Sequence, residues 1–226
     1  MFAIEPGRDY AVVTGDVIDS SSLEATQRRR LPELIHEISQ SLTEWFGEQR
    51  LTPVSIFGGD SWRILLATPA DALRVALFLR ASLLASDLNI DSRLAIAVAG
   101  VDFVPHGVDI EAADGEAFRL SGRLLDEDNR TAGEIRFGAA QSDLTTRWRL
   151  PLRLLDALVR STWNEKRAAA VCGALRGWTR QHTGETWSPP VSRQTIDRHL
   201  SEACWPEVEG TLKEFEQALS DRMSAQ

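Results

Sequence analysis

Three short acidic motifs hold the side chains of this chain that are best suited to chemistry. They are residues 15–20 (GDVIDS), 57–61 (FGGDS) and 113–118 (ADGEAF). Asp16 follows an apolar run, and Asp60 lies in a Gly-Gly-Asp turn. Carboxylate oxygens that converge on one point suit Mg²⁺ or Mn²⁺, and such an ion can bind the phosphates of a nucleotide. We therefore predict a metal site at Asp16 and Asp60, with a nucleotide as its partner.

The same residue types also have purely structural roles. A Gly-Gly-Asp sequence is favoured in tight hairpin turns, and Asp19 with the three serines after it suits a helix N-cap. Arg119 and Arg123 are one helical turn apart, which is typical of a solvated stripe or of ion-pair partners for nearby aspartates. The sequence leaves the metal site and the structural alternative open.

The elements that must position these motifs alternate between strand and helix. The apolar patterns predict strands at 10–14, 54–57, 62–66, 92–99 and 134–138, and helices at 31–46, 69–85 and 116–128. Pro32 is expected in the first turn of the first helix. The strand at 92–99 alternates large apolar residues with alanine, which predicts a central strand with one smooth face under a helix. The order predicts an α+β fold with a ferredoxin-like βαββαβ domain.

From about residue 150 onward the apolar pattern is helical only. We therefore predict two domains, 1–140 with the sheet and 141–226 with helices alone. Ten basic residues against four acidic ones lie between Arg147 and Arg198, so the acidic excess of the chain lies mainly in the first domain.

Residues 191–200 have the pattern of a DNA-recognition helix. Ser192 suits its N-cap, while Val191, Ile196 and Leu200 are expected to face inward. The side chains predicted to face outward and contact double-stranded DNA are Arg193, Gln194 and Arg198, because arginine and glutamine pair with guanine and adenine edges. We read this part as a helix-turn-helix-like domain.

One feature of the tail favours a different role. Residues 180–190, where the first helix of a helix-turn-helix belongs, contain Gly184 and a double proline, and predict a loop. The alternative is a helical unit for homodimerisation or partner docking, with tryptophans as its anchors. They are Trp163, Trp178, Trp187 and Trp205.

The acidic motifs together resemble the palm of class III nucleotidyl cyclases. Asp16 and Asp60 stand where that family holds its metal-binding aspartates, and Arg123 stands where it keeps an arginine that neutralises developing phosphate charge. The resemblance implies a nucleotide-phosphate role for Arg119 and Arg123.

The base-reading positions of that family are replaced in this chain. Ile56 stands in place of the purine-reading lysine, Ala112 in place of its polar partner, and Arg119 in place of an asparagine. These replacements predict that the chain has no cyclase activity and no catalytic residues.

A second resemblance covers nearly the whole chain. Residues 15–20, 58–60, 93–100 (RLAIAVAG) and 113–118 are similar to the SatD family of bacterial proteins, as is the pattern of the C-terminal helices. It implies a degenerate cyclase-like fold with a helix-turn-helix tail, and so a transcriptional regulator. The alternatives are a metal-dependent nucleotide-binding or nucleotidyl-cyclase enzyme and a non-catalytic interaction scaffold.

Composition narrows the remaining classes. A net charge of -8 excludes a surface that is basic throughout, although a local basic face remains open. Cys172 and Cys204 are the only cysteines, which argues against a disulfide framework or a zinc module. The sequence has no signal-peptide pattern and no long apolar run, so we expect a cytoplasmic protein without a membrane partner.

Overall fold

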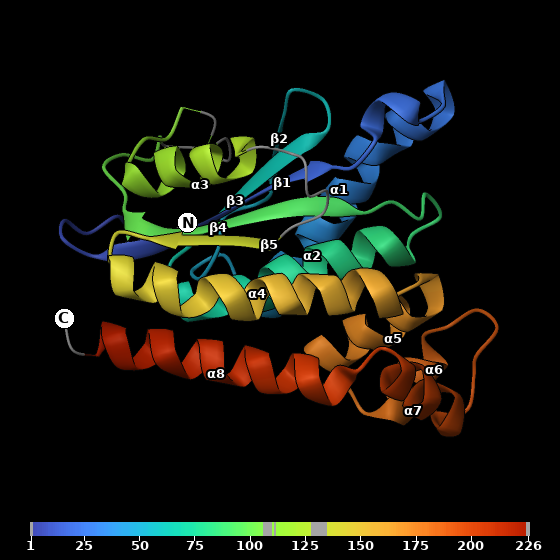
Figure 1. Ribbon diagram of the computed structural model, residues 1–226. Helices are drawn as coiled ribbons and strands as arrows, with labels where there is room; N and C mark the ends of the chain where they lie inside the picture. Colours follow the sequence, from blue (N-terminus) through green and yellow to red (C-terminus); the bar gives the residue numbers. More distant parts are fainter. Residues whose placement is uncertain (1, 106–109, 111, 128–134, 225–226) are drawn as a thin grey trace.

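The computed structural model describes residues 2–105, 110, 112–127 and 135–224. It is an α+β structure built on one five-stranded sheet (Figure 1). The elements of the first part are β1 (Asp9–Val17), α1 (Ala25–Phe46), β2 (Ser55–Phe57), β3 (Ser61–Leu66), α2 (Ala72–Ala85), β4 (Ser92–Gly100), α3 (Glu116–Asp126) and β5 (Ile135–Ala139). The predicted order is confirmed. Asp128 and Glu134, two of the predicted element ends, lie outside the described residues.

The elements after β5 are helices throughout the described part. They are α4 (Ser142–Thr162), α5 (Glu165–Leu175), α6 (Arg180–Glu185), α7 (Arg193–Glu202) and α8 (Trp205–Met223). None of the helices in the ranges that the structure describes has the length and hydropathy to cross a bilayer.

The strands lie in the order β2-β3-β1-β4-β5. β1 is antiparallel to both β3 and β4, and β2 forms an antiparallel hairpin with β3. β5 is parallel to β4, because the chain returns through α3 before it enters the last strand. The end of β1 and the starts of β3 and β4 therefore lie side by side at one end of the strands.

The two faces of β4 differ in side-chain size. Leu94, Ile96 and Val98 of β4 belong to the main core, which also contains residues of α1, α2 and α4. Ala95 and Ala97 lie on the other face, where they pack against α3. Small side chains let a helix approach the sheet closely, so the prediction of a central strand with one smooth face is confirmed.

The position of Pro32 differs from the prediction. α1 begins at Ala25, and Pro32 lies inside the helix rather than in its first turn. The two turns before Pro32 are started by a capping box, in which Glu24 and Gln27 exchange side-chain-to-backbone hydrogen bonds. The residues of those two turns are mostly exposed and polar. The helical spacing of apolar residues therefore begins only at Leu31, which is why the predicted start of the helix was too late.

The helical tail shares the core of the sheet. One continuous hydrophobic cluster runs from the sheet, α1 and α2 into α4, α5, α7 and α8. The fully buried Arg80 of α2 also bonds Asp156 of α4 at 2.5 Å and Asp91, which precedes β4, at 2.6 Å. The predicted division at residue 140 coincides with the change from strands to helices, and two separate domains stay a prediction.

The loop predicted for residues 180–190 is wrong in its first half. Residues 180–185 form α6, with Thr179 as its N-cap. Gly184 does not break the helix; a Cβ there would lie 2.4 Å from the backbone oxygen of Val191. The missing side chain lets the segment leading into α7 pack against α6, and the Val191 amide donates to the Gly184 carbonyl at 3.0 Å.

Candidate functional site

Asp16 and Asp60 lie in one pocket of about 370 Å³ where β1 ends and β3 and β4 begin. Asp60 is in the β2–β3 turn, where Gly58 and Gly59 adopt φ values of 64° and 97°. The Val17 amide donates to the Asp60 carbonyl at 3.3 Å, which holds this turn beside the end of β1. We call this the acidic pocket; its lining residues are Asp16, Val17, Ile18, Asp19, Ser20, Ser21, Asp60 and Arg93. The predicted convergence of the two aspartates is thus observed.

The register of the sheet determines the partners of Asp16. Ser61 of β3 and Arg93 of β4 lie directly opposite Asp16 on its two sides. Cross-strand neighbours project from the same face, so their side chains meet. Arg93 forms an ion pair with the Asp16 carboxylate, and Ser61 donates to it at 3.4 Å. The Asp16 charge is therefore neutralised within the sheet.

Asp60 also has an internal partner. The Ser20 hydroxyl, in the 3₁₀ turn Ser20–Ser22 that follows β1, donates to the Asp60 carboxylate. This bond ties the chain after β1 to the hairpin turn. The structural role of Asp60 is thus a cross-link between two loops.

The acidic pocket fits a divalent cation poorly in this arrangement. Within the ranges the structure describes, no group of three or more His, Cys, Asp or Glu side chains is placed to hold a metal ion. Mg²⁺ often needs only one or two carboxylates when substrate phosphates complete its ligands. Asp16 is engaged by Arg93, however, so a metal would require that ion pair to break. The Mg²⁺ or Mn²⁺ site stays a prediction, and it requires Arg93 to release Asp16.

Arg119 and Arg123 are not among the residues that line the acidic pocket. Arg119 bonds Asp114 at 2.7 Å and Asp102 at 3.3 Å, beyond the end of β4. Arg93 is at the other end of that strand, on the order of 25 Å away at the usual rise per residue. Arg123 bonds Glu116 at 2.5 Å and lowers the pKa of that carboxyl. Both arginines are exposed and paired with acids, and their nucleotide-phosphate role stays a prediction.

The tail contains a second candidate site. α5, α6 and α7 each pack against the other two, and we call them the three-helix unit. Each helix starts at an N-cap residue whose side chain accepts a hydrogen bond from a backbone amide of the first turn. The N-cap residues are Asn164, Thr179 and Ser192 respectively. The caps fix where each short helix begins. The predicted cap at Ser192 is confirmed.

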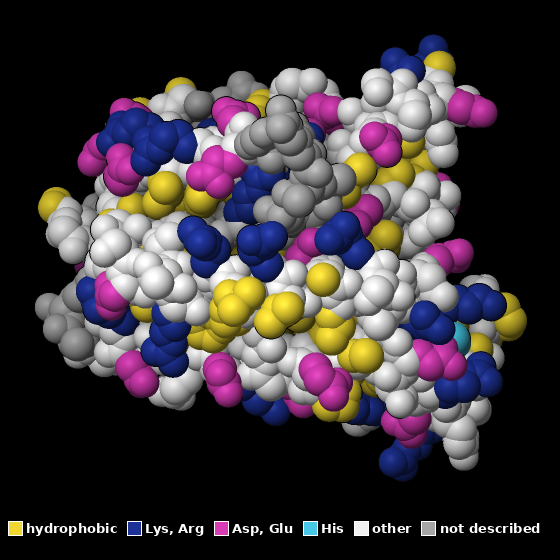
Figure 2. Space-filling model, viewed as in Figure 1, with side chains coloured by type: hydrophobic (Ala, Val, Ile, Leu, Met, Phe, Trp, Pro, Cys, Tyr) yellow, Lys and Arg dark blue, Asp and Glu magenta, His cyan; other side chains and the backbone are white. Residues whose placement is uncertain are grey.

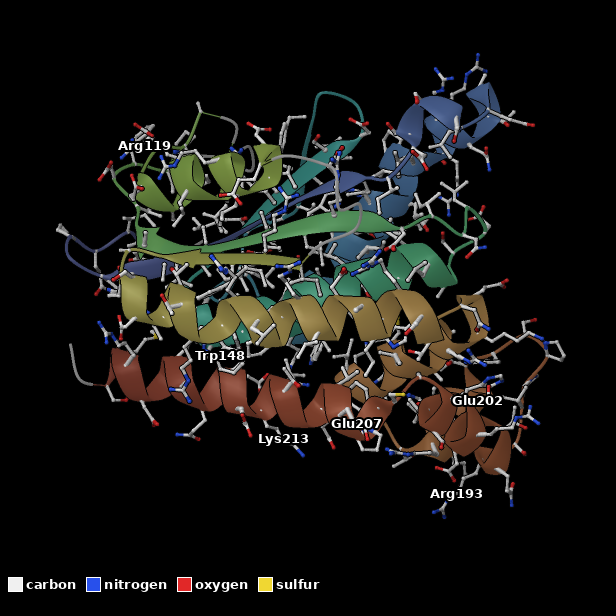
Figure 3. All side chains as sticks on the ribbon, in the orientation of Figure 1. Arg119, Trp148, Arg193, Glu202, Glu207 and Lys213 are labelled. Atoms are coloured by element: carbon white, nitrogen blue, oxygen red, sulfur yellow. The ribbon has the colours of Figure 1, made fainter. Side chains whose placement is uncertain are left out.

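α7 has one buried and one exposed face. Ile196 is fully buried and Leu200 is 4% exposed, whereas Arg193, Gln194 and Arg198 are exposed, as predicted. Figure 3 shows Arg193 at one end of the molecule, pointing outward, and Arg119 at the opposite end. The exposed face of α7 is available to a partner.

The charges on α7 are only partly compensated. Asp197 lies 3.6 Å from Arg193 and 3.4 Å from Arg180 of α6. The side chains of Gln194 and Arg198 have no hydrogen-bond or ion-pair partner among the described residues. Asp197 and Arg93 are the site residues that the sequence analysis missed. Each lies in a segment with a clear helix or strand pattern and belongs to no site motif. Their ion pairs with residues of neighbouring elements, Arg180 and Asp16, give them a place in the two sites.

Comparisons with known proteins find only solved structures of low similarity. No family model matches the chain, and no curated protein matches it in sequence. A bacterial light-regulated adenylyl cyclase is 15% identical, with a TM-score of 0.42 over 57% of this chain and 75% of that chain. The guanylyl cyclase Cya2 is 16% identical, with a TM-score of 0.42 over 62% of this chain and 77% of that chain. These values assign neither a family nor an activity.

Proposed function

We propose that the chain is a DNA-binding transcriptional regulator of SatD-like type, in which the three-helix unit contacts the duplex. The observation that carries the proposal is α7: its apolar face is buried in the unit, and its other face presents Arg193, Gln194 and Arg198 to solvent. In helix-turn-helix proteins the second helix of the motif enters the major groove, and its N-terminal residues read base edges. Arg193 and Gln194 are the first two residues of α7.

The charge of the three-helix unit supports contact with phosphate. Residues 164–204 hold six Lys and Arg residues and four Asp and Glu residues, although the whole chain has a net charge of -8. Figure 2 shows dark blue side chains at this end of the molecule with magenta ones among them. The amide groups at the start of α7 add a partial positive charge near the same face. DNA contact is therefore expected here rather than over the acidic remainder.

The negative charge of Asp197 is expected to limit the affinity of the three-helix unit for DNA. Its carboxylate shares the charges of Arg180 and Arg193 and lies beside the face that would approach phosphate. An acid in this position repels the backbone of every DNA sequence alike. Specificity then depends on base contacts by side chains such as Gln194.

The first part of the chain is proposed to have no cyclase activity. Arg93 neutralises Asp16, and Ile56 is partly buried against the main core instead of carrying a polar group that reads a purine. Incubation with ATP or GTP and Mn²⁺ is expected to yield no cyclic nucleotide. Product that disappears in an Asp60→Ala variant would contradict this and favour the enzyme alternative.

One observation favours the interaction-scaffold alternative. Leu150 and Leu154 lie one turn apart on α4 and are 63% and 62% exposed. Figure 2 shows hydrophobic side chains gathered along the boundary between α4 and α8. The predicted homodimer would use this strip. A Leu150→Arg/Leu154→Arg variant that converts a dimer to a monomer in light scattering would support that role.

Selection from a random pool of duplexes tests the DNA proposal. The parent protein is expected to enrich a sequence, and Gln194→Ala is expected to change the preferred base at one position. Lys213→Gln on α8 is the matched control, because it removes one exposed positive charge outside the three-helix unit. Failure of the parent protein to enrich any sequence would leave the scaffold as the better account.

A further inference from the structure

A larger cavity than the acidic pocket lies between the sheet part and the tail. It has a volume of about 500 Å³ and opens between α1, α2, α5 and the α6 region. We call it the groove. Its walls are largely apolar and aromatic, with Leu34, Ile38, Phe78, Trp178 and Trp187 among the lining residues. Volumes of this size hold small organic ligands.

Arg176 is the cation of the groove that lies against its aromatic side chains. The Arg176 guanidinium, at the end of α5, lies 4.8 Å from the ring centroids of both Phe78 and Trp178. It donates to the Ser41 hydroxyl of α1, and its Nε is buried without a hydrogen-bond partner among the described residues. A guanidinium carries five N–H donors, so most of its capacity is unused.

Within the described part of the chain Arg176 forms no ion pair, although the Glu44 carboxylate of α1 acts on its charge from a longer distance. Burial lowers its pKa, while an arginine remains protonated at every physiological pH. A buried donor that is left unsatisfied costs free energy, and a positive charge in partly apolar surroundings costs more. An anion that bonds the free edge of the guanidinium would remove both costs.

The other polar groups of the groove are neutral or at its mouth. Ser82 and Cys172 lie 3.6 Å apart inside it, and burial raises the pKa of the Cys172 thiol to about 11. The lining acids Glu37 and Asp87 are 57% and 64% exposed, and both pair with Arg30. Of the two arginines that line the groove, Arg30 is thus paired with acids, and Arg176 is the one without an ion pair among the described residues.

We propose that the groove binds a small organic monoanion, with its carboxylate or sulfonate on Arg176 and its aromatic or aliphatic body against Phe78, Trp178 and Trp187. The anionic group forms charge-assisted hydrogen bonds with the guanidinium, and the body replaces water on the apolar wall. A single charge suits the site, because Arg176 is the one lining cation without an ion pair among the described residues. The proposal goes beyond the DNA-binding role and does not depend on it.

Two fluorescent probes that differ in charge test the site. 8-Anilino-1-naphthalenesulfonate carries an aromatic body and a sulfonate, and N-phenyl-1-naphthylamine has the same body without the charge. The parent protein is expected to bind the sulfonate saturably at one site. Arg176→Gln is expected to weaken sulfonate binding about tenfold or more and to change binding of the neutral probe less than about twofold.

Three further variants make the result decisive. Arg180→Gln, which removes an exposed arginine of α6, is expected to bind both probes as the parent does. Arg176→Lys keeps the charge and is expected to bind the sulfonate better than Arg176→Gln. Ala169→Trp fills the groove from α5 and is expected to lose both probes. The proposal is overturned if the parent binds no sulfonate, if Arg176→Gln weakens both probes equally, or if Ala169→Trp binds the sulfonate normally.

Discussion

The acidic pocket and the three-helix unit both hold charged side chains, but they differ in how those charges are compensated. In the acidic pocket Asp16 is paired with Arg93, and Asp60 accepts a hydrogen bond from Ser20. In the three-helix unit Arg198 on the outer face and Arg176 in the groove form no ion pair with a carboxylate among the described residues. Compensated charges stabilise the fold, whereas uncompensated ones are free to bind a ligand.

The difference shows the limit of a motif. Acidic motifs at strand ends are typical of metal sites, yet their neighbours decide whether the carboxylates are available. Arg176 belongs to no motif in the sequence, yet the aromatic side chains around it in the groove make it a candidate binding group.

Removal of the buried side of α7 should have the largest effect. Ile196 is fully buried between α7 and the rest of the core, so Ile196→Ala is expected to lower the free energy of unfolding by about 2–5 kcal/mol. Urea denaturation followed by tryptophan fluorescence measures the change. Leu154→Ala is the control, because that side chain is 62% exposed and should change stability by less than about 0.5 kcal/mol. Equal stabilities for the two variants would contradict the placement of α7.

Removal of Arg93 should expose the charge of the acidic pocket. Arg93→Gln leaves Asp16 without its cation, so the variant is expected to bind Mn²⁺ about tenfold more tightly than the parent. Calorimetric titration measures the affinity. Arg93→Lys should show no such gain, and Asp16→Asn with Asp60→Asn should abolish the gain in the Arg93→Gln background. Tight Mn²⁺ binding by the parent, unchanged in Arg93→Gln, would show that the carboxylates are already available.

Removal of Asp197 should strengthen DNA binding. Asp197→Asn frees the side chains of Arg180 and Arg193 and removes a negative charge beside the duplex. The affinity for any duplex is expected to rise about three- to tenfold at moderate salt. Fluorescence anisotropy measures it, with Asp221→Asn on α8 as the charge-matched control. An unchanged affinity would place the duplex elsewhere on the molecule.

The smallest expected effect is a pH dependence of stability. Burial lowers the pKa of His199, whose ring stacks on Trp187 with centroids 5.5 Å apart. Below about pH 6.5 the unfolded chain takes up a proton more readily than the folded one, so the free energy of unfolding falls as the pH decreases. His199→Gln should show a weaker decrease between pH 7.5 and 5.0. The same pH profile in parent and variant would exclude this contribution.

The sequence predicts the sheet part well because local patterns there agree with the tertiary structure. The alternation in β4 separates Leu94, Ile96 and Val98 from the alanines, and the two faces of the sheet follow from it. Pro32 and Gly184 were misjudged because both are usual helix breakers. A capping box starts the helix two turns upstream of the proline, and close packing against Val191 requires the glycine.

The sites were less predictable because their contacts are long-range. The sequence brings Asp16 and Asp60 together correctly, but the pairing of Asp16 with Arg93 follows from strand register. Arg176 and Ser41 are 135 residues apart in the chain, and no short motif links them. The residues of α7 were predicted because one helix contains them all.

The salt dependence of duplex binding shows directly whether the uncompensated charge of α7 contacts DNA. Anisotropy titrations between about 50 and 200 mM salt give the slope of log K against log salt. Arg198→Gln is expected to reduce that slope by about one, and Lys213→Gln to leave it unchanged. Equal slopes for the parent and both variants, or no binding by the parent at low salt, would contradict the account.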